Sequence, residues 1–149
     1  MTDAFYRQVR SGLISLAVLF GVATVSSAQE PKEEGLHGEW EMVRMVYKGV
    51  VQDPARVRGS TIKIEKGKLL LRYKDWNSPV EFRVEVRPEK EPPEIDLYLS
   101  NGALTRGIYE LKGSTLRIVL GQRDDPRPTS FDAEKDKSLL LYTLDRFTR

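Results

Sequence analysis

The sequence predicts an all-β protein, an antiparallel up-and-down barrel of about eight strands preceded by an N-terminal signal segment. Short apolar runs recur at regular spacing between Gly, Pro and Asn residues, which is typical of many strands and little helix. From Val80 to Arg87, apolar and charged residues alternate strictly, as in a half-buried strand. Strands with one apolar face must stack as a sandwich or close into a barrel, and closure removes edges that invite aggregation. We therefore favour the barrel.

The N-terminus has the three parts of an export signal. Arg7 and Arg10 precede an apolar stretch over residues 13–25, and the small residues Ser26-Ser27-Ala28 come after it. This stretch is shorter than the roughly 18 apolar residues that cross a bilayer. We predict a signal peptide over residues 1–28, with a retained anchor as the alternative, and an exported protein, periplasmic or extracellular.

The length and composition of the chain beyond the signal limit its domain number, its partners and its covalent links. Residues 29–149 carry 22 Lys and Arg against 21 Asp and Glu, a net charge of +1, with both signs intermixed. The length of residues 29–149 predicts one domain. The balanced and intermixed charge predicts that this domain binds no nucleic acid. The chain has no cysteine, which excludes disulfides and a lipid anchor on residue 29. Residues 29–35 are charged and predict a disordered tether, so that the domain covers residues 36–149.

The first half of the domain predicts a strand, a helical turn and a hairpin. Both faces of Glu39–Tyr47 are apolar, so a helix remains an alternative to a strand there. Asp53–Arg58 suits one helical turn, because aspartate caps helices and proline fits the first helical position. A Lys66-Gly67 loop pairs Glu65 with Lys68, Ile64 with Leu69 and Ile62 with Leu71.

The second half predicts another hairpin, two further strands and a long loop. A Lys112-Gly113 loop pairs Tyr109 with Leu116 and Gly107 with Ile118. The other strands are Ile95–Leu99 and Ser138–Arg146. Residues 121–137 form a long connection, which is either a lid whose Arg127 meets an anion at the barrel mouth or an anchor that buries Phe131. We favour the anchor.

A barrel with an even number of strands pairs its first strand with its last, which makes Trp40 and Arg146 neighbours. Gly38-Glu39-Trp40 with an arginine ending the last strand resembles the lipocalin pattern. That likeness implies that the guanidinium of Arg146 lies over the indole of Trp40 and closes one end of the barrel. Such a cation–π contact is worth about 0.5 to 2 kcal/mol, so its role is structural.

A broader resemblance covers nearly the whole chain beyond the predicted signal, residues 29–149. It rests on Leu36-His37-Gly38-Glu39-Trp40, Glu94-Ile95-Asp96-Leu97, Gly107-Ile108-Tyr109-Glu110-Leu111, Thr115-Leu116-Arg117-Ile118 and Arg127-Pro128-Thr129-Ser130-Phe131. This order is similar to a planctomycete lipocalin-like domain family of unknown function. The resemblance implies a lipocalin-like barrel in an exported protein. Because that family has no agreed catalytic or ligand-binding residues, the resemblance assigns none to this chain.

Catalytic and metal chemistry find little support in the residues. The single histidine, His37, and the absence of cysteine argue against a catalytic triad and against a zinc site. The acidic run that starts at Asp132 resembles a calcium loop, but Lys137 and Thr143 stand where glycine and glutamate are needed. We predict no enzyme, no catalytic residue, no metal and no cofactor.

The barrel interior is then the main candidate for function. The residues predicted to point inward are Trp40, Met42, Ile62, Ile64, Leu69, Leu71, Phe82, Val84, Leu97, Leu99, Tyr109, Leu116 and Ile118. Strict alternation also points Arg44 inward, where an unpaired charge is costly. We expect Arg44 to escape at a rim or bulge, rather than to bind a ligand's acid group or an internal carboxylate.

Such a barrel suits either of two functions. The first is binding of a small apolar or amphipathic molecule, favoured by an internal cavity above roughly 300 Å³. Its candidate ligand-binding residues are Trp40, Arg44, Phe82, Tyr109, Arg127 and Phe131. The second is a filled barrel that meets a protein partner in the envelope through its outer face, where Val43, Met45 and Tyr47 form an apolar patch.

Overall fold

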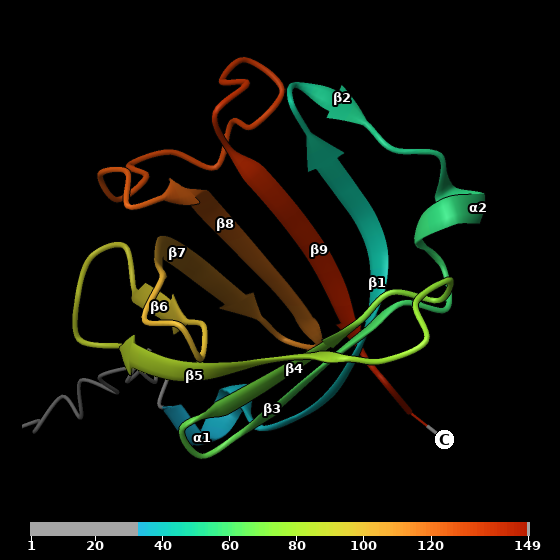
Figure 1. Cartoon of the computed structure of the whole chain (residues 1–149), viewed down its shortest axis with the longest axis horizontal. Coiled ribbons are helices and arrows are strands. Elements are labelled where there is room, and N and C mark those ends of the chain that lie inside the picture. The colour runs from blue at the N-terminus through green and yellow to red at the C-terminus, as the bar shows by residue number, and fades with distance from the viewer. Residues whose placement is uncertain (1–32, 149) are drawn as a thin grey trace, which may run out of the picture.

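The computed structural model describes residues 33–148, so the predicted signal peptide of residues 1–28 lies outside the described residues. Within this range two short helices and nine strands follow one another (Figure 1). They are α1 Glu33–Leu36, β1 Gly38–Tyr47, β2 Val50–Val51, α2 Pro54–Val57, β3 Thr61–Glu65, β4 Lys68–Arg72, β5 Val80–Arg87, β6 Glu94–Tyr98, β7 Leu104–Lys112, β8 Thr115–Arg123 and β9 Leu140–Arg146. None of the helices in residues 33–148 is long and apolar enough to span a membrane.

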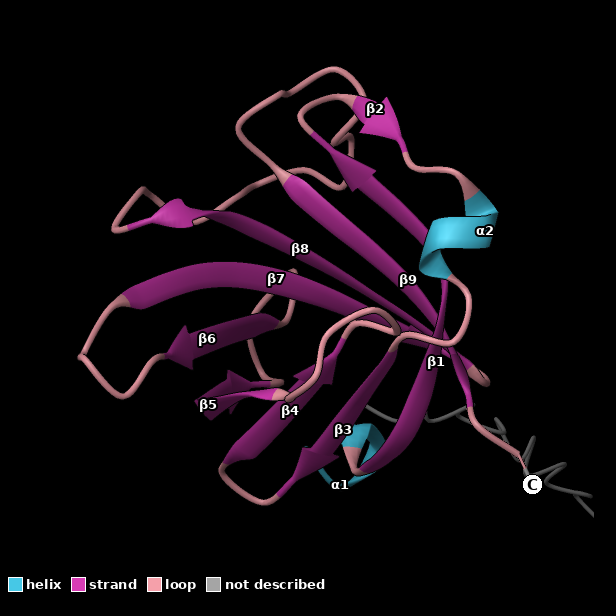
Figure 2. Ribbon diagram, turned by 45° about the vertical axis from the view of Figure 1, so that its right-hand side comes forward, coloured by secondary structure: helices cyan, strands magenta, loops and turns pink. Residues whose placement is uncertain are grey.

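Eight of the strands form one closed antiparallel barrel. The order is β1-β3-β4-β5-β6-β7-β8-β9, and β9 pairs back with β1. Strands that follow one another in the chain therefore lie side by side around the barrel (Figure 2). The extra strand, β2, pairs only with the end of β1. The predicted all-β up-and-down barrel is confirmed, and so is the helical turn, with Asp53 as the N-cap of α2.

The predicted register is confirmed for one of the two hairpins and is wrong for the other. The Lys66-Gly67 hairpin has the predicted register. In the β7–β8 hairpin the loop is Gly113-Ser114, so Tyr109 pairs with Ile118 and the predicted pairing with Leu116 is wrong. Gly113 has a φ of 59°, and a type II′ turn requires a glycine with positive φ as the first loop residue. The shift keeps every side chain on its predicted face, because it moves the pairing by two residues.

A β-bulge in β1 changes which side chains face the interior. The register with β9 shifts between Met42 and Arg44. Before the bulge Met42 lies in the interior core, and beyond it Met45 packs against the same core. An inserted residue reverses the alternation of a strand. The predicted outer patch on this strand, which included Met45, is therefore wrong.

Buried apolar side chains form one cluster inside the barrel and a smaller one on its outer face. The interior cluster comprises Leu36, Trp40, Met42, Val57, Ile62, Ile64, Leu69, Leu71, Val84, Ile95, Leu97, Tyr109, Leu116, Ile118, Leu120, Tyr142 and Leu144. The outer cluster comprises Val46, Ile108, Val119, Ala133, Leu139 and Leu141. Leu99, predicted to point inward, belongs to neither cluster.

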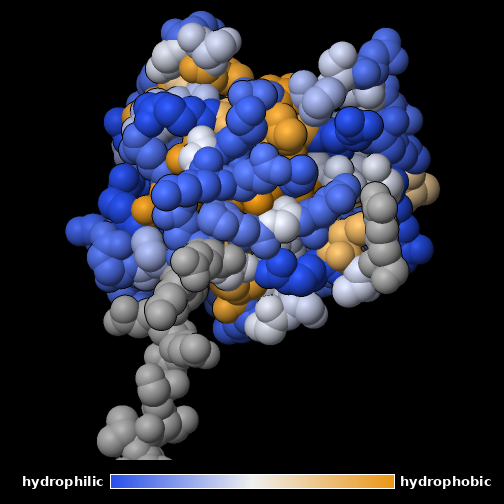
Figure 3. All heavy atoms as spheres, turned by 90° about the horizontal axis from the view of Figure 1, so that it is seen from below, coloured by the Kyte–Doolittle hydropathy of each residue, from blue (hydrophilic) through white to orange (hydrophobic). Residues whose placement is uncertain are grey.

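One end of the barrel, which we call the closed end, is sealed by α1 and two side chains. Trp40 is fully buried and its indole N–H donates to the carbonyl of Leu36 at 2.9 Å. The guanidinium of Arg146 lies 4.2 Å from the centre of the Trp40 rings. Because α1 includes Glu33–Gly35, these three residues belong to the domain and not to the predicted tether. Seen from the side of α1, the surface is mainly hydrophilic with scattered apolar spots (Figure 3).

The opposite end, which we call the loop end, carries the longer connections. These are residues 48–60, 73–79, 99–103 and 124–139. They join strand ends that all lie on this side, because neighbouring strands alternate in direction. Four long connections at one end can surround an opening, whereas the closed end has two tight turns, α1 and one longer loop.

Candidate ligand-binding site

A cavity of about 200 Å³ lies inside the barrel toward the loop end. Its lining residues are Ile62, Leu69, Leu71, Phe82, Leu97, Thr105, Ile118, Leu120, Gly121, Leu140 and Tyr142. Most of these side chains are aliphatic or aromatic, and the polar atoms that they bring are two hydroxyl groups. The barrel is therefore filled in its closed half and hollow near the loop end. The volume is below the roughly 300 Å³ typical of larger ligand sites.

The wall of this cavity contains a pair of tyrosine hydroxyls. Tyr142 lines the cavity, and its hydroxyl lies 2.5 Å from that of Tyr73. Burial raises the pKa of both phenols, so both stay protonated at neutral pH. One hydroxyl donates to the other, and the second hydroxyl keeps its own proton to donate. The pair can therefore offer a hydrogen bond to an acceptor.

An open groove of about 360 Å³ adjoins the cavity at the loop end. It is lined by Met45, Tyr47, Arg56, Tyr73, Lys74, Asp75, Trp76 and Leu140. Leu140 lines both spaces, and the Tyr73–Tyr142 pair joins a groove residue to a cavity residue. The apolar interior thus continues into a partly charged groove.

Three of the predicted ligand-binding residues lie inside the barrel, but at different distances from its loop end. Phe82 lines the cavity. Trp40 lies at the closed end under Arg146. Tyr109 is fully buried, and its hydroxyl has no hydrogen-bond partner among residues 33–148. Burial, with smaller contributions from Glu33 and Glu89, raises its pKa to about 12.

Arg44 lies at the bulge and turns away from the interior. Its guanidinium forms an ion pair with Glu134 of the 124–139 loop, and both side chains are more than one-third exposed. The expectation that Arg44 leaves the interior at a bulge is confirmed. Arg44 consequently does not line the cavity.

Arg127 fastens the 124–139 loop to the outer face of β6 and does not point into a barrel mouth. Its guanidinium donates to the carboxylate of Asp96 at 2.7 and 3.1 Å and to the carbonyl of Gly107 at 2.7 Å. Arg87 donates to the same carboxylate at 2.5 Å. Burial raises the pKa of Asp96, but the hydrogen bonds from Arg127 and Arg87 outweigh burial and leave this pKa below its usual value.

Phe131 anchors the same loop on the outer face. It packs against the outer cluster, and the guanidinium of Arg117 lies 4.9 Å from the centre of its ring. The structure thus agrees with the favoured anchor rather than the lid, and it places the anchor in the outer cluster of apolar residues. Neither Phe131 nor Arg127 lines the cavity.

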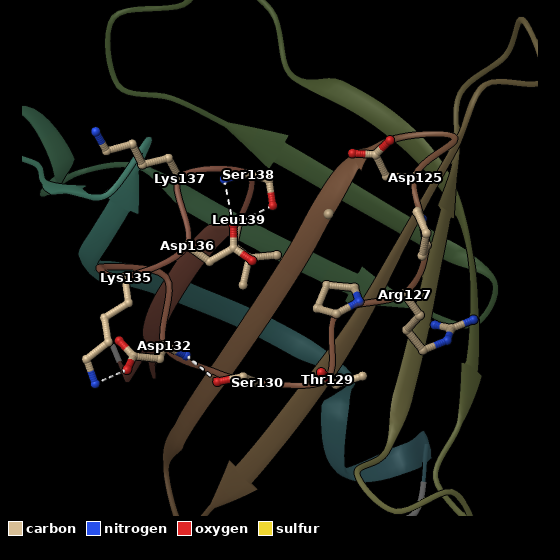
Figure 4. A pocket seen from close by; sticks show the side chains of 13 residues that line it. Asp125, Arg127, Thr129, Ser130, Asp132, Lys135, Asp136, Lys137, Ser138 and Leu139 are labelled. Atoms are coloured by element: carbon tan, nitrogen blue, oxygen red, sulfur yellow. Dashed lines mark hydrogen bonds and ion pairs between the residues drawn. The ribbon is translucent and has the colours of Figure 1, made fainter.

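A polar hollow of about 680 Å³ lies between this loop and the end of β8 (Figure 4). Several of its charged side chains have partners within the same loop. Lys135 pairs with Asp132 at 2.6 Å, and Asp136 accepts from the backbone N–H and the hydroxyl of Ser138. Across the described range of residues 33–148, no three His, Asp or Glu side chains gather where they could hold a metal ion.

The cavity residues that sequence reasoning missed are Thr105, Leu120, Gly121, Leu140 and Tyr142, and beside them it missed the groove residue Tyr73. Leu140, Tyr142 and Leu144 alternate along the last strand, so their shared face could have been read from the sequence. Tyr73 follows β4 in a loop, where no alternating pattern of residues indicates which way a side chain points.

Comparison of this chain with protein-family models, with curated proteins and with solved structures gives no match. The cavity, the groove and their chemistry are therefore the basis on which a function can be assigned. Those features lie at one end of the barrel, where the loops leave the interior open to further contacts.

Proposed function

We propose that this protein is an exported, lipocalin-like module that binds a small, largely apolar molecule at the loop end of its barrel. The observation that carries the proposal is the internal cavity, which is lined almost entirely by apolar side chains and bordered by a hydroxyl pair. Small-molecule sites are concave and mostly apolar, with a few placed polar groups. The export part rests on the N-terminal pattern of residues 1–28.

The volume of the cavity limits the ligand. A dry cavity of about 150 Å³ lined by aliphatic and aromatic residues holds a benzene molecule. At about 200 Å³, this cavity suits one substituted ring or a short branched chain. The adjoining groove can receive a polar substituent, since Arg56, Lys74 and Asp75 lie there. An amphipathic molecule with a compact apolar part fits both spaces.

The test uses two probes of similar size, ethylbenzene and acetophenone. We expect both to bind, because both fill the cavity, and we expect the methyl resonances of Ile62 and Leu69 to shift in NMR titrations. Leu71→Phe fills the cavity and should weaken binding tenfold or more. Leu70→Phe is the matched control, because Leu70 neighbours Leu71 on β4 but lies outside the interior cluster. Absence of any shift with both probes, together with no bound molecule in native mass spectrometry of the protein from its own cells, would rule the proposal out.

The hydroxyl pair gives a second, chemical test of the same site. Acetophenone carries a hydrogen-bond acceptor and ethylbenzene carries none, so only acetophenone should depend on the tyrosines. Tyr142→Phe keeps the shape of the ring and should weaken acetophenone binding about two- to tenfold, the worth of one neutral hydrogen bond. Ethylbenzene should bind the variant unchanged. Equal losses for the two probes would show that Tyr142 acts by packing alone.

A further inference from the structure

Large apolar side chains are exposed mainly at the loop end of the barrel. Within residues 33–148, four of the five exposed large apolar residues lie on the β1–β2 hairpin and in the β4–β5 loop. We call these four the rim surface: Tyr47 is 46% exposed, Val50 60%, Val51 45% and Trp76 50%. The fifth, Phe147, is at the opposite end beyond β9.

Tyr47, Val50 and Trp76 lie on one side of the β1–β2 hairpin, whereas Val51 pairs with Val46 and points to the other side. Tyr47 pairs with Val50 across the short β1–β2 hairpin, and Tyr47 and Trp76 line the same groove. The ring of Tyr73 supports Trp76 edge-on, with 4.6 Å between the ring centres. The hairpin itself is held in shape by its loop residues, Lys48 and Gly49, which both have positive φ, as a type I′ turn requires. The rim surface is therefore built around a hairpin tip of defined backbone, with apolar side chains on both of its sides.

Cations surround the rim surface and lack carboxylate partners. The ammonium of Lys48 lies 5.2 Å from the centre of the Tyr47 ring, and Arg56 and Lys74 line the groove. Within residues 33–148 none of these three forms an ion pair. The groove contains one carboxylate, that of Asp75.

The contrast with the barrel wall is clear. Many basic side chains on the outer face of the strands pair with acids, as Lys63 does with Glu65 and Lys68 with Glu81. Those on the wall that lack such a pair, such as Arg72, have no exposed large apolar residue beside them in the same strand. Among the residues that the structure describes, exposed aromatic and aliphatic groups coincide with several cations that have no such partner only at the rim.

We propose that the rim surface docks on an anionic lipid surface. Trp and Tyr favour the level of the head groups, where an amphipathic ring meets both water and hydrocarbon. Val50 and Val51 can enter the boundary of the acyl chains, and each nearby Lys or Arg gains from anionic lipids. A protein partner would need carboxylates at matching positions, whereas a lipid surface supplies negative charge without a fixed arrangement. Tyr47, Trp76, Arg56 and Lys74 also line the groove beside the proposed ligand site, but docking on a lipid surface needs no ligand in the cavity, so the two proposals can fail separately.

The experiment uses the full chain and vesicles of phosphatidylcholine, with or without phosphatidylglycerol, whose acyl chains carry bromine. Bromine quenches the fluorescence of an indole that enters the acyl region. Of the two tryptophans, Trp40 is buried at the closed end and Trp76 is half exposed at the rim. Quenching therefore reports docking of the rim, even if another part of the chain also binds the vesicle. We expect quenching with the anionic vesicles and a sharp loss of it at high salt.

Variants separate the apolar and the electrostatic contributions. Val50→Ser with Val51→Ser should abolish quenching, and Phe147→Ser, which removes an equally exposed apolar group at the other end, should leave it unchanged. Lys48→Gln and Arg56→Gln should each weaken vesicle affinity about fivefold, the equivalent of about 1 kcal/mol per basic residue. Lys66→Gln, in the hairpin turn at the closed end, is the charge control.

Three results would overturn the proposal. One is no quenching on anionic vesicles, and another is equal quenching on neutral and anionic vesicles. The third is quenching that survives the double valine change. Circular dichroism of each variant checks that the barrel is intact, and since all the changed side chains are exposed, we expect no loss of fold.

Discussion

Tyr109 shows what a single buried polar group costs this barrel. Its hydroxyl is enclosed at the closed end and finds no hydrogen-bond partner among residues 33–148. An unpaired buried hydroxyl costs about 1 to 3 kcal/mol by protein mutational data. Asp96 is the opposite case, because two arginines satisfy its buried carboxylate. Burial of a polar atom is therefore costly or harmless here according to its partners.

Replacement of Tyr109 by phenylalanine should raise the free energy of unfolding at pH 7 by about 1 kcal/mol, since it removes the unpartnered hydroxyl and keeps the ring. The same change should also alter how the free energy of unfolding depends on pH in the alkaline range. The folded-state pKa of about 12 lies above the usual value of 10.0, so between these values the unfolded chain loses its proton first and stability falls as the pH rises. Tyr109→Phe should reduce that fall.

Urea unfolding at pH 7 and at pH 10.5 measures both effects. Tyr98→Phe is the control, since its hydroxyl makes a long, exposed contact with Glu85 at 3.2 Å. A lower stability of Tyr109→Phe than of the wild type at pH 7 would mean that the hydroxyl has a partner in solution.

At the scale of elements, local patterns predict a strand well and its register less well. The alternation of Val80–Arg87 predicts β5 with its bounds, because the strand is half buried along its whole length. The β7–β8 loop could be placed at either of two positions, since both keep Tyr109 and Leu116 on the inner face. Only the backbone conformation of Gly113 separates them.

The polarity of Arg44 indicates that its strand is irregular, but the exact position of the bulge in β1 and the Arg127 contact could not be predicted from local sequence. Each depends on a partner far along the chain. The bulge arises in the pairing of β1 with β9, and Arg127 meets Asp96 across 31 positions. Of the six residues predicted to bind a ligand, only Phe82 therefore lines the cavity.

The 124–139 loop gives the prediction at this scale. Arg127→Ala removes the charge-assisted bonds that tie the loop to β6 and leaves Asp96 with Arg87 alone. We expect a loss of about 2 kcal/mol in the free energy of unfolding, with faster hydrogen exchange in the loop. Arg106→Ala is the matched control, since Arg106 makes only an exposed bond to the carbonyl of Asp125 and should change stability by less than about 0.5 kcal/mol. Equal effects of the two changes would show that Arg127 does not hold the loop.

At the scale of the whole molecule, one end of the barrel is densely packed and the other contains the cavity that we propose as the ligand site. The closed end packs Trp40, Met42 and Leu116 without exposure, and it joins the first strand to the last. A dense region of this kind can hold the fold while the loop end keeps a cavity, because a protein's stability is not spread evenly over its structure. Changes at the closed end should therefore affect stability, and changes to the side chains that line the cavity should mainly affect binding.

Arg146 gives the sharpest test of that division. Its guanidinium lies over Trp40 and donates to the carbonyls of Gly35 at 2.7 Å and His37 at 3.0 Å, so it links β9, β1 and α1. Gly38 makes room for it, since a Cβ there would lie 2.8 Å from the guanidinium. We expect Arg146→Ala to cost about 2 kcal/mol in the free energy of unfolding.

Arg146→Lys should recover only part of that loss, because a compact ammonium does not stack on the indole and span two carbonyls as a planar guanidinium does. Denaturant unfolding followed by tryptophan emission measures the stability of each variant, and the acetophenone titration measures binding by the folded protein. The division predicts reduced stability with an unchanged dissociation constant, because the cavity lies toward the other end. A weaker affinity with unchanged stability would instead place Arg146 in the binding site and not in the closure of the barrel.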